Sequence, residues 1–203
     1  MAETRRRITR AAVELHATVG PARTTVSAVA ERAGVQRHTV YRHFPAEAEL
    51  YGACSAHWLA ANPMPDTASW RAIRDPHERL ARALDELYAY YERAEPMLAN
   101  VVRDLELVPA LGPTAVPFRT FMAEAASALE AGWSSRGRRR PLLRAALRHV
   151  LDFQSWRSVT ADGSITRADA VELATALVEA AVERRAIRVR AAASRSRSSA
   201  GPR

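Results

Sequence analysis

Lysine is absent from the 203-residue chain, so all 30 of its basic side chains are arginines. Together with 22 acidic residues they give a formal net charge of +8, which favours a polyanionic partner such as nucleic acid or an acidic membrane surface. Cysteine is nearly absent, and a lone Cys54 excludes an intrachain disulfide and a cysteine-rich zinc site. A single thiol is typical of the reducing cytoplasm, and we expect a cytoplasmic protein.

Long apolar runs are also missing. The longest uncharged stretch, residues 50–65, is shorter than the roughly 20 residues that cross a bilayer, and two prolines interrupt it. Near the N-terminus, Glu14 and His16 stand where a signal peptide would have its apolar core. The arginines do not form the polar face of one amphipathic helix. We therefore predict no leader peptide and no membrane partner.

Residue patterns that support catalysis or metal binding are absent as well. The six histidines form neither an HExxH motif nor a pair at helical spacing with an acid nearby, and the eight glycines form no phosphate-binding loop. Cys54 lies in an apolar helix, where a buried thiol is inert. We predict no catalytic residue, no metal site and no cofactor, so an enzyme is a weak alternative.

The positive charge is concentrated at the C-terminal end. Residues 184–203 contain seven arginines and no acid, whereas residues 1–50 carry a net charge of only +3. Residues 191–203 are rich in Ala, Ser and Arg and lack apolar periodicity, so we predict a disordered tail there. The net charge is thus a poor guide to where a nucleic acid would bind.

Strand patterns are nearly missing, because apolar residues recur at every third or fourth position instead of alternating. We predict an all-α fold of about nine helices, in which Gly20, Gly34, Pro45 and the later prolines mark the ends. The predicted domains are a helix-turn-helix unit at 1–46, a larger helical domain at 47–190 and the tail. The predicted helices lie near 8–19, 26–33, 37–44, 47–61, 76–93, 95–107, 118–133, 141–160 and 166–189.

The most informative stretch is residues 25–44, TVSAVAERAGVQRHTVYRHF. Two short helices joined by a tight turn at Gly34 predict a helix-turn-helix, whose second helix enters the major groove of DNA. Thr25 can cap the first helix, and Gly34 supplies a turn conformation that most residues resist. The alternative is that the polar side chains of the second helix are merely solvated. Those able to meet base edges and phosphates are Gln36, Arg37, His38, Thr39 and Arg42, with the Tyr41 hydroxyl available for a phosphate.

This stretch resembles the DNA-binding domain of the TetR family of transcriptional repressors over roughly residues 5–52. The resemblance implies that Thr25, Tyr41 and His43 contact phosphates and that Arg37, His38 and Thr39 lie near bases. The Arg37 guanidinium fits the two acceptors of guanine. The matching positions are Thr25, Ala30, Gly34, Val35, Thr39, Val40, Tyr41, His43, Phe44 and Leu50.

One position departs from the family pattern. The family usually has a lysine at the start of the fourth helix, in contact with phosphate, whereas this chain has Glu47. An acid cannot make that contact. We expect either weaker binding to the DNA backbone or compensation by the arginines of residues 5–10, unless that segment is a frayed, solvated terminus.

The remainder is similar to the family's ligand-binding and dimerisation domain in architecture and helix count. This resemblance implies a regulator that binds a palindromic double-stranded DNA operator as a homodimer and is released by a small molecule. Arg103, if buried, needs an acidic partner, and we expect the neighbouring Asp104 to point elsewhere. The residues predicted to line the pocket are His57, Trp58, Tyr88, Tyr91, Arg103, Phe121 and Trp156.

The last two predicted helices carry the dimer interface in the family. Here each has an apolar stripe with small alanines that allow close packing, unless both stripes face the core of one chain. Two further hypotheses about function stay open: a regulator with a vestigial pocket or an activating effect, and a ligand-binding helical protein without specific DNA binding. The predicted interface residues are Leu143, Leu147, Val150, Leu151, Val171, Ala174, Leu177, Val178 and Ala181.

Overall fold

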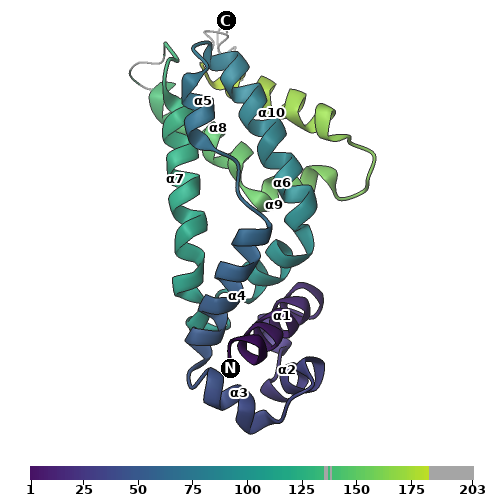
Figure 1. Ribbon diagram of the computed structural model, residues 1–203. Helices are drawn as coiled ribbons and strands as arrows, with labels where there is room; N and C mark the ends of the chain where they lie inside the picture. The colour runs from purple at the N-terminus through teal and green to yellow at the C-terminus, as the bar shows by residue number, and fades with distance from the viewer. Residues whose placement is uncertain (135–136, 138, 183–203) are drawn as a thin grey trace, which may run out of the picture.

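A computed structural model of the chain describes residues 1–134, 137 and 139–182. Over these residues the fold is all-α, as predicted, with ten α-helices, two short 3₁₀ helices and no strand (Figure 1). The predicted tail at 191–203 lies outside the described residues. The helices are α1 (Ala2–Thr18), η1 (Pro21–Arg23), α2 (Val26–Ala33), α3 (Arg37–His43), α4 (Glu47–Ala61), α5 (Thr67–Ala72), α6 (Pro76–Asp104), η2 (Pro109–Ala115), α7 (Val116–Glu130), α8 (Arg139–Leu151), α9 (Phe153–Thr160) and α10 (Arg167–Val182).

The three N-terminal helices and the first half of α4 share one hydrophobic core. Ile8 and Ala12 of α1 are fully buried, and they pack with Val29 of α2, Val40 of α3 and Leu50 of α4. This unit lies at one end of the molecule, with α4 leading from it into the larger domain (Figure 1). Since α4 contributes to the core of the first unit, it can transmit a change in one unit to the other.

The longest helix, α6, corrects the prediction of two separate helices at 76–93 and 95–107. It runs through Pro96 for 29 residues, although proline removes one backbone hydrogen bond and the residue before it disfavours the helical conformation. Tyr91, Ala94 and Met97 are buried on either side of the proline. Burial of this face compensates for the local cost, which tertiary packing commonly does.

The prediction of one helix over 141–160 is also wrong, because the structure has two helices there. The break falls at Asp152, between α8 and α9. Asp152 caps α9, since its Oδ2 accepts a hydrogen bond from the Ser155 backbone N–H at 2.8 Å. The break leaves the last carbonyls of α8 free of helical partners. The sequence patterns do not predict the short α5, which Asp66 caps.

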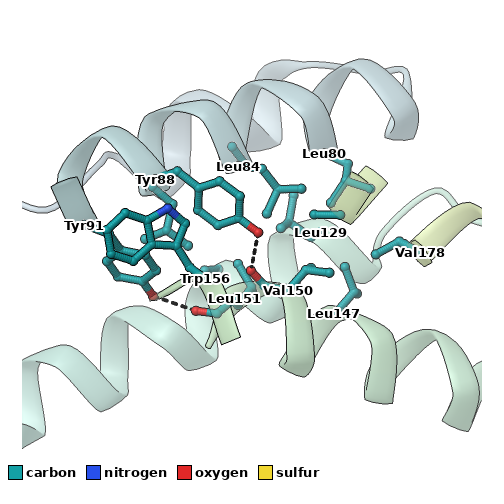
Figure 2. Packing of buried hydrophobic residues seen from close by; sticks show 14 of the residues in the cluster. Leu80, Leu84, Tyr88, Tyr91, Leu129, Leu147, Val150, Leu151, Trp156 and Val178 are labelled. Atoms are coloured by element: carbon teal, nitrogen blue, oxygen red, sulfur yellow. Dashed lines mark hydrogen bonds between the residues drawn. The ribbon is translucent and has the colours of Figure 1, made fainter. Parts of the chain in front are cut away.

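Two tyrosines of α6 donate hydrogen bonds to those free carbonyls (Figure 2). The Tyr88 hydroxyl donates to Val150 O at 2.9 Å, and the Tyr91 hydroxyl donates to Leu151 O at 2.6 Å. Around them, Trp156 and leucines of α6 and α8 form the main core. Burial raises the pKa of both phenols above the usual value, so they remain protonated donors. The tyrosines therefore fasten α6 to the end of α8.

No helix in the described part of the chain is both long and apolar enough to span a bilayer.

Candidate nucleic-acid interface and interior cavity

The turn between α2 and α3 has the geometry that the sequence predicts. The Thr25 hydroxyl accepts a hydrogen bond from Ala28 N–H at 3.1 Å and thereby caps α2. Gly34 ends that helix with φ of 63°, in the left-handed region that favours glycine. Its N–H donates to Glu31 O, and Val35 N–H donates to Ala30 O at 2.9 Å. These bonds fix the direction in which α3 leaves the turn.

The outer face of α3 presents most of the predicted DNA-contacting side chains to solvent. The exposed residues include Gln36, Arg37, His38 and Arg42. The aromatic Tyr41 is also 49% exposed, which is unusual for a large ring. Among the described residues, neither Arg37 nor Arg42 has an acidic partner. Two unpaired guanidiniums on one short helix can therefore meet base edges or phosphates.

Three other predicted DNA contacts differ in their exposure. Thr25 is exposed, and Thr39 is half-buried with its hydroxyl 3.4 Å from the His38 ring. His43 is buried in the unit, so only a small part of its side chain can reach a phosphate.

The N-terminal arginines are not a loose arm, because they lie within α1. Arg5 donates to His43 O at the C-terminal end of α3, and its guanidinium stands 4.0 Å from the centre of the Phe44 ring. Arg7 donates to Ala33 O and Gly34 O at the end of α2. Both cations thus sit at helix C-termini, where positive charge is favourable. They position α2 and α3, and their capacity to compensate for Glu47 is correspondingly reduced.

An interior cavity of about 290 Å³ lies between the two units. Its walls come mainly from α4, α6, η2 and α7, and His16 of α1, Pro21 of η1 and Phe153 of α9 also line it. Most of its 19 lining residues are apolar or aromatic. A largely apolar interior with a few polar groups is typical of a small-molecule site.

Of the residues predicted to line a ligand pocket, Trp58 alone lines this cavity. Tyr88 and Trp156 line a smaller cavity of about 190 Å³ beside α10. Tyr91 and Phe121 are core residues, and His57 is exposed on α4. Sequence reasoning missed His16, Tyr51, Tyr90, Phe118 and Arg119, because only the packing of distant helices shows which side chains share a cavity.

The prediction for Arg103 is wrong in both parts. Its side chain is about half exposed and lies outside the cavity lining, and it pairs with Asp104, whose Oδ1 lies 2.7 Å from Arg103 Nε. Asp104 itself is buried and also accepts a hydrogen bond from Ala22 N–H at 3.0 Å. The hydrogen bond from Arg103 lowers the pKa of the Asp104 carboxyl below its usual value. The pair therefore joins the end of α6 to η1 of the N-terminal unit.

Asn100, one turn earlier on α6, extends this junction. Its side-chain N–H group donates to His16 O at 3.1 Å and to Ala17 O at 2.9 Å. These carbonyls belong to the last turn of α1, which has no helical partners for them. Here the larger domain binds directly to the helix that supports the helix-turn-helix.

The apolar stripes of α8 and α10 pack largely against the core of the single chain. Most predicted interface residues already pack in its core: Leu143, Leu147, Val150, Leu151, Ala174 and Val178. Val171 and Ala181 are half-buried against that core. Leu177 remains exposed, as do the neighbouring Leu173 and Leu142, at 43%, 56% and 56% respectively. The exposed leucines are thus accessible to a partner subunit, whereas the six core residues are already covered within one chain.

An exposed recognition helix on an all-α scaffold with an interior cavity defines a helix-turn-helix protein of two helical units. Residues 8–54 match the family described as "Bacterial regulatory proteins, tetR family". Residues 8–54 thus match the DNA-binding domain of the TetR family, as the resemblance of residues 25–44 predicted. Family and fold together support a DNA-binding transcriptional regulator.

The fold is shared with solved structures of low sequence identity, while no curated protein matches the chain. The "Clostridium perfringens putative fatty acid metabolism regulator" is 17% identical, covers 85% of this chain and 97% of its own, and superposes with a TM-score of 0.63. A "putative TetR-family transcriptional regulator" from Mesorhizobium loti is 20% identical, with 89% and 95% covered and a TM-score of 0.60. A "TetR-like transcriptional regulator" from Rhodococcus sp. RHA1 is 20% identical, with 88% and 95% covered and a TM-score of 0.60. At these identities the likeness shows the fold alone.

Proposed function

We propose that this protein is a homodimeric repressor that binds a palindromic DNA operator through α3 and is released when a small molecule enters the cavity between α4, α6 and α7. The observation that carries the proposal is the exposed face of α3, where Arg37 and Arg42 have no acidic partner among the described residues. Arg37 contacts a guanine, and Gln36, His38 and Thr39 lie beside neighbouring bases. Thr25, Tyr41, Arg42 and part of His43 contact phosphates.

Dimerisation is proposed for the exposed apolar surface of α8 and α10. Leu173 and Leu177 are four residues apart and therefore lie on one face of α10. Leu142 is a further exposed leucine on α8, which packs beside α10. A two-fold pair is also what an operator requires, since it places two recognition helices about 34–36 Å apart in successive major grooves.

The proposed domain division follows the two cores. Residues 1–46 carry the DNA-reading helices, and residues 47–190 carry the cavity and the dimer surface, with α4 contributing to both cores. A ligand that prefers one orientation of the DNA-reading unit changes operator affinity by shifting the population of that orientation.

The test is selection of the bound sequence from a random duplex pool, followed by fluorescence anisotropy at several salt concentrations. The expected result is a palindromic site whose affinity falls steeply with salt, as counterions are released from the phosphates. The matched variant Arg37→Ala should broaden the selected sequence, while Arg93→Ala, an exposed arginine of α6, should leave it unchanged. Binding without any sequence preference, or none at low salt, would refute the proposed function.

A further inference from the structure

His16 of α1 is a buried histidine that lines the interior cavity from the DNA-reading unit. Only 4% of the residue is exposed, and its ring lies 5.4 Å from that of Tyr51 on α4. Among the described residues, no group forms a hydrogen bond with the imidazole. An imidazole in a cavity wall with no hydrogen-bond partner in the protein is available to a ligand that supplies the missing bond.

The protonation state of His16 limits what that ligand can be. Burial lowers the pKa of the imidazole to about 4, so at neutral pH the ring is uncharged, with one nitrogen that donates and one that accepts. A hydroxyl or carbonyl group can engage such a ring without bringing a charge into the interior.

The rest of the lining argues against a cationic ligand. Among the described residues that line the cavity there is no aspartate or glutamate, and the one formal charge is the guanidinium of Arg119 at the exposed start of α7. A buried cation would lose its hydration and find no acid in this lining, and the Asp104 carboxylate that acts on His16 is already paired with Arg103. Apolar side chains of α6, among them Met97 and Val101, line part of the remaining surface, and Leu105 lines it just beyond the end of that helix.

We propose that His16 is the ligand-contacting residue of the DNA-reading unit, and that it recognises a mostly apolar, uncharged molecule through one hydroxyl or carbonyl group. This inference rests on the proposed function, because it names the class of ligand and the route of its effect. The backbone carbonyl of the same residue accepts a hydrogen bond from Asn100 of α6, while its ring packs on Tyr51 of α4. His16 thus stands where α1, α4 and α6 meet, and a ligand bonded to it acts directly on the orientation of α1.

The first measurement is a titration of the full chain with 1-octanol. Binding is detected by tryptophan fluorescence, because Trp58 lines the cavity. Octanoate and octylammonium serve as probes of equal length and opposite charge. His16→Phe keeps a ring against Tyr51 but cannot form the hydrogen bond, whereas His16→Gln can. His57→Phe is the matched control, because it makes the same change at an exposed histidine of α4.

We expect His16→Phe to weaken 1-octanol binding about fivefold, which corresponds to one ordinary hydrogen bond. His16→Gln should stay within about twofold of wild type, and His57→Phe should equal it. Octylammonium should bind at least about tenfold more weakly than 1-octanol. Equal binding of 1-octanol to wild type and His16→Phe would overturn the proposal, as would tighter binding of octylammonium or octanoate.

A second measurement does not depend on the fold of the phenylalanine variant. In wild-type protein labelled with ¹⁵N at histidine, 1-octanol should shift the ring nitrogens of one imidazole, identified as His16 by its absence from His16→Gln. No shift at saturation would refute the contact.

The coupling between ligand binding and DNA binding is then measured. The readout is the fluorescence anisotropy of labelled DNA that carries the selected sequence. Saturating 1-octanol should weaken DNA binding in wild type and His57→Phe but not in His16→Phe, and an equal effect in all three would refute the route through His16. If the wild-type protein binds no DNA, the proposed function fails, whereas the ring shift still tests the contact.

Discussion

Lowering the pH should destabilise this protein through His16 before its carboxylates are protonated. The folded chain holds the imidazole at a pKa of about 4, while the unfolded chain returns it to the ordinary value of 6.5. Between these two values the unfolded state binds more protons, so the free energy of unfolding falls as the pH falls. At pH 5 the expected loss relative to pH 7.5 is about 2 kcal/mol, from the two pKa values and about 1.4 kcal/mol per pKa unit.

The window from pH 7.5 to 5 separates His16 from the acidic groups that also contribute. Hydrogen bonds from arginines lower the pKa of Asp104 and Glu130, and their stabilisation is present above the ordinary values of 3.8 and 4.5. It is lost only as the pH falls through the lowered folded values, below this window.

The assay is urea unfolding monitored by circular dichroism. The protein concentration is held fixed, because dimerisation would otherwise change the apparent stability. Wild type and His16→Gln are compared at each pH, so that other titrating groups cancel in the difference. The stability of wild type should fall more steeply than that of His16→Gln by about 2 kcal/mol over the window. Parallel curves for the two proteins would show that the ring is not held neutral by burial.

Three further changes test other parts of the structure. Arg37→Ala should relax the preference at one position of each half-site at a cost of about 1–3 kcal/mol in operator affinity, and uniform weakening across sequences would instead place Arg37 on a phosphate. Asn100→Ala removes two hydrogen bonds to the end of α1 and should lower the free energy of urea unfolding by about 1–3 kcal/mol, and a smaller effect would mean that water replaces both bonds. Leu173→Glu with Leu177→Glu should produce a monomer in multi-angle light scattering with little change in helicity, since both residues are exposed, and a persistent dimer would move the interface elsewhere.

The helix-turn-helix could be predicted from the sequence because its determinants are local. Thr25 caps the helix that begins one residue later, and Gly34 ends that helix eight residues further on. Each signal acts within a few residues of its partner and depends little on the rest of the chain. The direction of α3 and the exposure of most of its polar face follow from that short segment.

Errors occur where distant residues outweigh a local preference. Proline and the residue before it favour a break near Pro96, but α6 continues because its flanking residues are buried against other helices. The opposite happens at Asp152, where an ordinary helical stretch is broken and the freed carbonyls receive hydroxyls from Tyr88 and Tyr91. Neither outcome is visible in a window of neighbouring residues.

The pocket is harder to predict from the sequence. A cavity forms where side chains of distant segments do not fill the space between them, and no residue type marks that place. The tyrosines at 88 and 91 are reasonable candidates for ligand contacts, yet backbone carbonyls some 60 residues away occupy both hydroxyls. His16 differs: it lies in the last turn of an amphipathic helix, and its ring packs on Tyr51 but has no hydrogen-bond partner among the described residues. A polar group that lines a cavity without a hydrogen-bond partner is a more specific indication of a ligand contact than an aromatic side chain alone. The same side chain belongs to the helix on which α2 rests, so the site that binds the ligand and the unit that reads DNA share a residue.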